Sequence, residues 1–283
     1  MFLTTTNNDK GIFSSTKTTL VGESIMPNHR DLHYFDRDRQ QKWRIAILHE
    51  DETLLVLNKP AGLPVIPERW HPEWPCLRSI AEERLGLPLF VVHRIDAGTS
   101  GLILFAKTEA SHRDLNQQFE HHHVEKIYHA LVSGEVVEDA LTMQQPLAEH
   151  PHRPGMMVVS RDGKPAVTLM RVLERFRGAT LVEAQPQTGR QHQIRVHLQA
   201  LGHPLLVDSL YGNAEAFFLS SIKPGFYRKP EEPEQPLIKR LTLHACALQF
   251  HHPLSHAPTG FTAPAPKDFQ AVLKNLRKYA HRK

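Results

Sequence analysis

Short runs of apolar residues, each ended by glycine, proline or charged residues, recur along the chain from about residue 45 onward. Runs of this kind, rich in branched side chains and bounded by turn residues, are typical of strands. The pattern predicts strands at residues 54–57, 102–105, 126–132, 167–173, 180–184 and 243–250. Arg177 and Gly178 lie at the turn between the fourth and fifth of these, which predicts a hairpin.

A second pattern, with apolar residues three and four positions apart, predicts helices between the strands. Thr108 is a suitable N-cap for a helix at 109–119, with Leu115 and Phe119 on its buried face. Gly202 and Pro204 follow the end of another helix. The helices are expected at residues 79–85, 109–119, 191–201 and 268–279. Alternating strands and isolated helices do not by themselves give the strand order.

The two ends of this pattern suggest where the folded part begins. Residues 1–30 are rich in Thr, Asn, Ser and Lys without sustained periodicity, and residues 29–44 carry dense charges of alternating sign. We therefore predict a flexible N-terminal extension at 1–44 and one globular domain at 45–283. Residues 213–239 hold few apolar pairs and are predicted to form an inserted surface loop.

Composition narrows the class of protein. The chain of 283 residues is 40% apolar and 23% charged, which is ordinary for a globular protein. Its two cysteines, Cys76 and Cys246, exclude a disulfide framework and fit a reducing compartment. No apolar run reaches the roughly 18 residues that span a bilayer, and no signal peptide is evident. We expect a cytoplasmic protein. The net charge of +4 permits a polyanionic partner without requiring one.

Candidate chemistry centres on residues 93–107, His-Arg-Ile-Asp-Ala-Gly-Thr-Ser-Gly-Leu-Ile-Leu-Phe-Ala-Lys. Asp96 lies in a loop directly ahead of a predicted buried strand, where functional residues are often placed. The residues alone leave two interpretations open. Asp96 is either a functional carboxylate or a turn residue that accepts backbone N–H groups.

Three strings resemble the motifs of one enzyme family. They are HRIDAGTSGLILFAKT from residue 93, KIYHALVSG from residue 126 and TGRQHQIRVH from residue 188. In this order they are similar to the RluA-type pseudouridine synthases, over roughly residues 51–250. The resemblance implies an α+β fold, with a mixed, mostly antiparallel bent sheet flanked by helices and an active cleft across its middle. Residues 45–283 would be the catalytic domain.

The same resemblance implies roles for four residues. Asp96 would be the catalytic carboxylate, acting as nucleophile or base, and Arg195 would pair with it. Tyr128 would lie against the target base. Arg94 would act near the displaced nucleotide, with a surface phosphate contact or a structural ion pair as its alternatives. A string N-K-P-x-G includes Asn58 and Lys59, which could approach phosphate or form a plain turn.

The implied reaction isomerises specific uridines of ribosomal or transfer RNA to pseudouridine. It breaks the glycosidic bond, turns the base and rejoins it to the sugar through carbon 5, and it needs neither metal nor other cofactor. RNA is the expected partner, without membrane association. We expect the protein to be a monomer.

Other readings of the sequence are weaker. A serine hydrolase would carry Gly-x-Ser-x-Gly before a helix, but residues 98–101 are one residue short and a strand follows. A metallohydrolase could use the histidines at 121–123, yet the sequence has no H-E-x-x-H or C-x-x-C spacing. A catalytically inactive RNA-binding protein of the same fold remains the alternative. It would not need Asp96, Tyr128 and Arg195 together, so the sequence favours the enzyme.

Overall fold

A single large sheet organises the parts of the chain that the computed structural model describes, residues 31–69, 71–226 and 233–281. The flexibility predicted for residues 1–30 lies outside these ranges. The strands are β1 (Leu32–Asp36), β2 (Gln41–Glu50), β3 (Leu54–Lys59), β4 (Phe90–Val91), β5 (Ser100–Ala106), β6 (Glu125–Ser133), β7 (Ala140–Met143), β8 (Leu147–Glu149), β9 (Met157–Val159), β10 (Thr168–Phe176), β11 (Ala179–Pro186), β12 (Leu243–His251) and β13 (Pro258–Thr262). The helices are α1 (Leu77–Leu85), α2 (Glu109–Glu120), α3 (Gln193–Ala200) and α4 (Lys267–Tyr279), with a short 3-10 helix at Leu219–Ser221.

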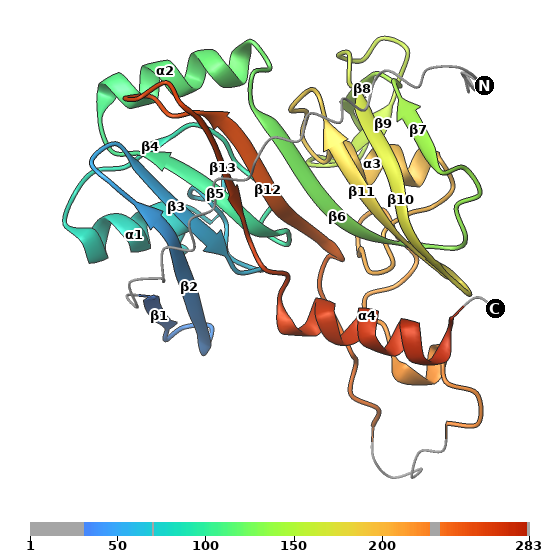
Figure 1. Ribbon diagram of the computed structural model, residues 1–283. Helices are drawn as coiled ribbons and strands as arrows, with labels where there is room; N and C mark the ends of the chain where they lie inside the picture. Colours follow the sequence, from blue (N-terminus) through green and yellow to red (C-terminus); the bar gives the residue numbers. More distant parts are fainter. Residues whose placement is uncertain (1–30, 70, 227–232, 282–283) are drawn as a thin grey trace.

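Within the described residues, eleven strands form the large sheet in the order β1-β2-β3-β5-β12-β6-β11-β10-β7. The other two strands of the eleven are β4, which pairs with β5, and β13, which pairs with β12, while β8 and β9 form a separate two-stranded sheet. β12 runs parallel to β5, and its pairing with β6 on the other side is antiparallel. The β5-β12-β6 segment lies at the middle of the molecule in Figure 1, between the two halves of the sheet. The mixed, mostly antiparallel sheet predicted from the sequence is therefore confirmed.

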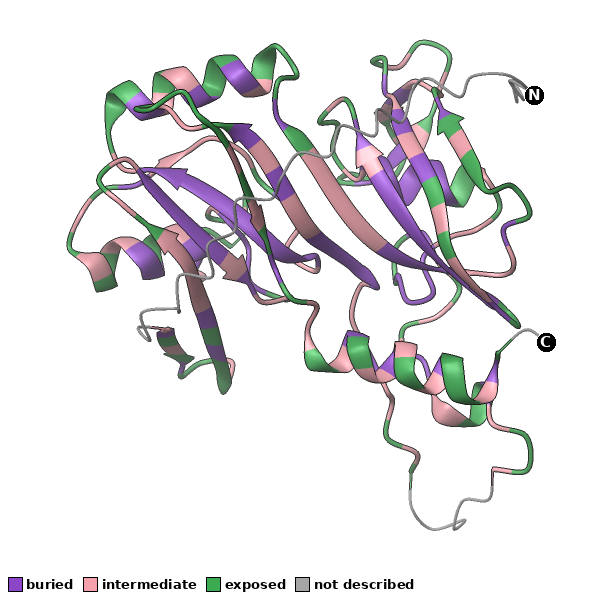
Figure 2. Ribbon diagram, viewed as in Figure 1, coloured by how far each residue is buried: buried purple, intermediate pink, exposed green. Residues whose placement is uncertain are grey.

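Helices cover the sheet where its side chains are apolar. α1 packs against β1, α2 against β4 and β5, and α3 against β9, β10 and β11. The buried side of α4 presents Phe269, Val272 and Leu276 to Phe176 and Leu181 of the β10–β11 hairpin. In Figure 2 β5 is buried along its whole length, whereas α2 and α4 alternate buried and exposed positions. No helix among the described residues is long and apolar enough to cross a bilayer.

The sheet begins before the predicted boundary between residues 44 and 45. β2 runs without interruption across that point and pairs with both β1 and β3. Trp43 and Ile45, two residues apart, both face the core and are buried. The expectation of a flexible extension up to residue 44 is therefore wrong for the described residues from Leu32 onward. The many charged residues on the outer face of β1 and β2 made the alternation of buried and exposed positions hard to recognise in the sequence.

The segment 213–239 is also more than a surface loop. Phe217, Ile222 and Ile238 are buried in the same apolar cluster as the inner face of α4. The backbone N–H of Phe217 donates to the carbonyl of Ile238 over 2.8 Å. The described parts of this segment thus supply core to one half of the sheet.

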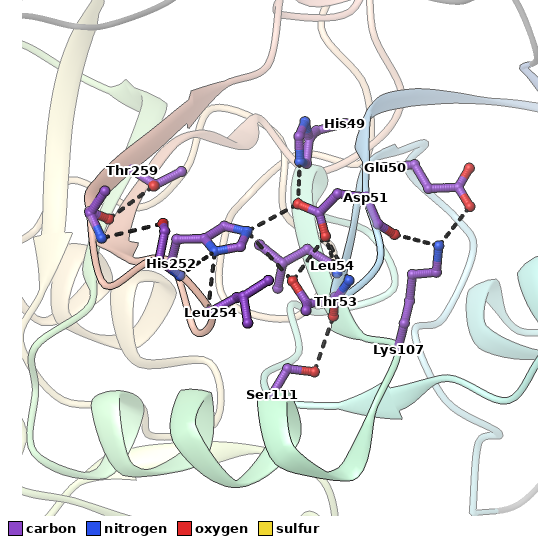
Figure 3. Close-up of polar contacts among 12 residues, drawn as sticks. His49, Glu50, Asp51, Thr53, Leu54, Lys107, Ser111, His252, Leu254 and Thr259 are labelled. Atoms are coloured by element: carbon purple, nitrogen blue, oxygen red, sulfur yellow. Dashed lines mark hydrogen bonds and ion pairs between the residues drawn. The ribbon is translucent and has the colours of Figure 1, made fainter.

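A polar cluster around Asp51 fastens the β2–β3 turn to neighbouring elements (Figure 3). One carboxylate oxygen accepts the N–H groups of Thr53 and Leu54 over 2.7 and 2.8 Å. The other faces His49 at 2.7 Å and His252, just past β12, at 3.0 Å. Burial would raise the pKa of Asp51, but these hydrogen bonds hold it well below its usual range. The cluster ties β3 and β12, the two neighbours of β5, to one another.

Gly101 allows the central parallel pair to form. Its φ is +118°, and a Cβ atom there would lie 2.2 Å from the backbone oxygen of Ala245 on β12. Only glycine fits this close approach and this backbone conformation. Because Gly101 is the second residue of β5, it also fixes the position of the loop that carries Asp96.

Candidate active site

The loop from His93 to Thr99 connects β4 to β5 and is held from behind by the end of β3. The carbonyl of Ala97, next to Asp96, accepts hydrogen bonds from the Lys59 ammonium at 2.9 Å and from the Gly62 N–H at 2.8 Å. Lys59 also donates to the carbonyls of Pro60 and Leu63. Its side chain has no exposed area, so the expectation that Lys59 could approach phosphate is wrong. It anchors the loop instead.

Burial lowers the pKa of Lys59 to about 7, although the nearby Asp96 carboxylate opposes that shift. Three carbonyl oxygens accept hydrogen bonds from the Lys59 ammonium, and none of them carries a full negative charge. Only the protonated form of this buried amine has three N–H groups, one for each carbonyl that it contacts.

Arg195 joins two carboxylates from different parts of the chain. Its Nε and Nη2 donate to the two oxygens of Asp208 over 2.7 and 2.8 Å. Its Nη1 donates to Oδ2 of Asp96 over 3.1 Å. The predicted contact between Arg195 and Asp96 is therefore present in the structure. The Arg195 side chain is only 7% exposed because it extends between these two acids.

The two acids are not equivalent. The Asp208 side chain has no exposed area and makes a two-point contact, and Oδ1 also accepts the N–H groups of Leu210 and Tyr211. Burial would raise the pKa of Asp208, but Arg195 and these N–H groups lower it. Burial alone would lower the pKa of Arg195, whereas the two carboxylates raise it. Asp208 thus holds the guanidinium charged and oriented.

Asp96 uses only one carboxylate oxygen for Arg195. Its side chain is 25% exposed, and among the described residues Oδ1 has no hydrogen-bond partner. The N–H of Thr99 donates to the backbone carbonyl of Asp96, not to its carboxylate. The structure therefore does not support the interpretation of Asp96 as a turn residue whose carboxylate accepts backbone N–H groups. One of its carboxylate oxygens is free, and the side chain is partly exposed to solvent.

A cavity of about 360 Å³ lies over this carboxylate. It is lined by all four residues predicted from the sequence, which come from four places in the fold: Arg94, Asp96, Tyr128 and Arg195. Tyr128 projects from β6, and burial, together with the Asp96 charge, raises the pKa of its hydroxyl. Tyr128 therefore stays protonated near neutral pH. Arg94 is exposed at the cavity.

Lys126 adds a cation to the same cavity. It stands two residues before Tyr128 on β6, so the two side chains leave the same face of the strand. Burial lowers the pKa of Lys126. The pKa of His93 is lowered to about 3, mainly by the burial of its own ring and further by the charge of Lys126. Among the described residues, no carboxylate pairs with Lys126. A half-buried cation of this kind is suited to an anionic ligand.

Sequence reasoning missed Lys126, His192, Asp208 and Tyr211. The spacing of Lys126 and Tyr128 on a predicted strand was a usable signal, because a period of two places both on one face. Asp208 lies in a loop whose path the sequence did not reveal, so its pairing with Arg195 had no local signal. His121–His123 lie at the end of α2, and among the described residues no group of three or more His, Cys, Asp or Glu side chains is arranged to hold a metal ion.

Comparison with known proteins now decides the family. The profile of a family described as RNA pseudouridylate synthase matches residues 53–200. The chain belongs to the RNA pseudouridylate synthase family. It is 35% identical over 257 residues to ribosomal large subunit pseudouridine synthase D of Pseudomonas aeruginosa, covering 86% of this chain and 76% of that protein. It is 38% identical over 216 residues to dual-specificity RNA pseudouridine synthase RluA of Vibrio vulnificus, covering 74% and 79%.

Solved structures agree with this family assignment. The structure of human RNA pseudouridylate synthase domain containing 4 is similar with a TM-score of 0.61 and 28% identity, over 82% of this chain and 92% of that one. The expected RluA-type resemblance and the expected RNA pseudouridine synthase activity are both confirmed by the relatives. Nothing in the comparisons favours the catalytically inactive alternative.

Asp208 should be needed for both stability and turnover. In Asp208→Asn the buried Arg195 would lose its two-point partner, which we expect to cost about 3–5 kcal/mol of unfolding free energy. The guanidinium would also lose its orientation toward Asp96, so turnover should fall. Chemical denaturation and a product assay on the same preparation measure the two effects.

Asp139→Asn is the matched control. Asp139 also pairs with an arginine, Arg175, but its side chain is 91% exposed. Its loss should change stability by less than about 1 kcal/mol. If Asp208→Asn were as stable and as active as this control, the anchoring role of Asp208 would be wrong.

Proposed function

We propose that this pseudouridine synthase acts on uridines of ribosomal RNA, with Asp96 as its catalytic carboxylate. The observation that carries the proposal is the pairing of one Asp96 oxygen with Arg195 while the other remains free at a cavity. The cavity volume of about 360 Å³ lies in the range of small-ligand pockets, so one nucleotide can enter it.

Asp96 acts at the sugar, as a nucleophile or as a base. Arg195 supports that role because an adjacent guanidinium stabilises the ionised carboxylate and fixes its direction. Tyr128, protonated and on the cavity wall, offers its ring to the face of the uracil and its hydroxyl to a proton transfer. The low exposure of Arg195 and Asp208 keeps water from one side of the reaction.

The target uridine must leave its base stack to reach Asp96, because its glycosidic bond is inaccessible inside a helix. Arg94 and Lys126 line the same cavity and carry no paired carboxylate among the described residues. They are suited to the phosphates on either side of the extruded nucleotide. Contacts of this kind release counterions, so RNA affinity should decrease as the salt concentration rises.

Support for ribosomal RNA comes from relatives named as ribosomal large subunit enzymes, such as the protein of Pseudomonas aeruginosa. A second relative is named as dual-specific, so transfer RNA is included in the test. The monomeric state, the cytoplasmic location and the independence from metal or other cofactor stay predictions.

The proposal is tested by incubating the purified protein with large-subunit ribosomal RNA, small-subunit ribosomal RNA and transfer RNA transcripts. Pseudouridine in each product is quantified by mass spectrometry of nucleosides, with and without a chelator in monovalent salt. We expect conversion at few positions of large-subunit RNA in both conditions. Conversion of transfer RNA alone would overturn the choice of substrate, and no conversion of any RNA would overturn the activity.

Tyr128 separates stacking from proton transfer. Tyr128→Phe keeps the ring, so RNA affinity should persist, but single-turnover conversion should fall by about tenfold or more if the hydroxyl moves a proton. Tyr128→Ala also loses base stacking, worth about 1–3 kcal/mol of binding. Binding isotherms and quenched single-turnover reactions distinguish these effects. Phe at this position turning over like the parent would exclude a role for the hydroxyl.

A further inference from the structure

His192 has an unusual backbone conformation directly beside Asp96. It is the N-cap of α3 with φ 53° and ψ 18°, the left-handed region that non-glycine residues seldom adopt. A non-glycine residue stays in this conformation only where surrounding contacts fix it, and such residues are concentrated at functional sites. The ring of His192 lines the cavity over Asp96.

Gln193 supplies the contacts that fix the backbone here. Its side-chain oxygen accepts from the Thr188 hydroxyl at 2.7 Å and from the Arg190 N–H at 3.0 Å. Its side-chain nitrogen donates to the carbonyl of Val167 at 2.9 Å. The Gln193 side chain therefore links the turn before α3 to residues on both sides of it. These hydrogen bonds stabilise the left-handed backbone conformation of the neighbouring His192.

The two ring nitrogens of His192 face different groups. Nδ1 is 2.7 Å from the hydroxyl of Tyr211. Nε2 is 3.9 Å from Oδ2 of Asp96, the oxygen that also accepts from Arg195. This distance is too long for a hydrogen bond, but such contacts at active sites often tighten once substrate is bound.

The hydrogen bonds of Tyr211 decide which nitrogen carries the proton. The backbone N–H of Met157 donates to the Tyr211 oxygen over 2.8 Å, so the hydroxyl hydrogen is free for His192. Tyr211 therefore donates to Nδ1, which leaves the ring hydrogen on Nε2. The opposite tautomer would leave the hydroxyl hydrogen without its acceptor and turn a lone pair toward a carboxylate. The electrostatics and the hydrogen bonds therefore both favour the tautomer of His192 with its hydrogen on Nε2.

Resting on the proposed role of Asp96, we propose that His192 is a positioning residue whose Nε2–H, together with Arg195, fixes Oδ2 of Asp96 and so leaves Oδ1 as the reacting oxygen. Tyr211, held by Met157 from the β8–β9 hairpin, sets the tautomer. Two donors on one oxygen restrict rotation of the carboxylate about its last bond. The reacting oxygen then meets the sugar in one orientation, which matters for rate more than for binding.

Burial, more than any neighbouring charge, keeps the His192 ring in this neutral form. Burial lowers the pKa of His192, the carboxylates of Asp96 and Asp208 oppose that shift, and Arg195 and Arg94 add to it. The ring is therefore neutral near pH 7. A neutral ring presents one N–H to Asp96 without adding a second full charge beside Arg195.

Two substitutions of His192 separate donation from structure. Asn tolerates the left-handed region and reaches Tyr211, but it has no atom at the position of Nε2. Gln places an N–H near that position, although it is less suited to this backbone. We expect His192→Asn to bind RNA within about twofold of the parent, because phosphate contacts dominate affinity. Its single-turnover rate should fall by about tenfold or more. His192→Gln, corrected for its folded fraction, should recover part of the rate.

Tyr211→Phe tests whether the tyrosine acts through His192. The ring that lies over Arg195 remains, with its centroid 4.8 Å from the guanidinium carbon, and only the hydroxyl is lost. The rate should decrease in the parent but show little further change in the His192→Asn background, because residues that act through each other are not additive.

The matched control is His256→Asn. His256 has φ 54°, close to that of His192, but it is exposed on another loop and does not line the cavity. It should leave the rate unchanged, which separates backbone effects from ring effects. A parental rate in His192→Asn would overturn the inference, as would full additivity with Tyr211→Phe. If the parent enzyme itself makes no pseudouridine, the proposed function fails instead, so the two failures are distinguishable.

Discussion

A single guanidinium shared between two carboxylates organises the centre of this protein. Asp208 holds Arg195 by two short hydrogen bonds at a buried site, and Arg195 then reaches Asp96 with its remaining nitrogen. A buried arginine needs compensation for the hydration it loses, and Asp208 supplies it. Two of the three guanidinium nitrogens bind Asp208, and the third contacts one oxygen of the second acid. One carboxylate serves structure and the other is left available for chemistry.

The sheet brings these groups together from distant parts of the chain. Gly101 lets β5 lie directly against β12, and Lys59 fixes the loop ahead of β5 from behind. Tyr128 arrives on the next strand across, β6, while α3 carries Arg195 to the same place. The site therefore lies where the two halves of the sheet meet, and its precision depends on backbone contacts that involve no catalytic side chain.

The sequence predicted the parts of the structure that depend on local pattern. The helices and the long central strands follow from apolar spacing, and the cap at Thr108 is present as expected, with its side chain accepting the N–H of Ser111. The motifs also predicted four of the side chains that line the cavity, because each lies within a recognisable string. Trp43 and Ile45 were missed since charged neighbours concealed their alternation.

What the sequence did not reveal depends on contacts between distant residues. Nothing local to Asp208 indicates that it will pair with Arg195, thirteen positions away across a turn of irregular path. The burial of Lys59 was not visible in the sequence, because its carbonyl partners come from two separate segments, residues 60–63 and the loop that carries Asp96. His192 likewise acquires its setting only when the β8–β9 hairpin brings Met157 to Tyr211.

The most direct measurement is the single-turnover rate of pseudouridine formation by Asp96→Asn on an RNA that the parent enzyme converts. Asn keeps the size of the side chain and a carbonyl oxygen for Arg195 but removes the charge, so fold and RNA binding should persist in a melting curve and a binding isotherm. We expect the rate to fall by several orders of magnitude, because an amide is neither a competent nucleophile at the sugar nor an effective base. Near-parental turnover by a folded Asn variant would contradict the central role of Asp96.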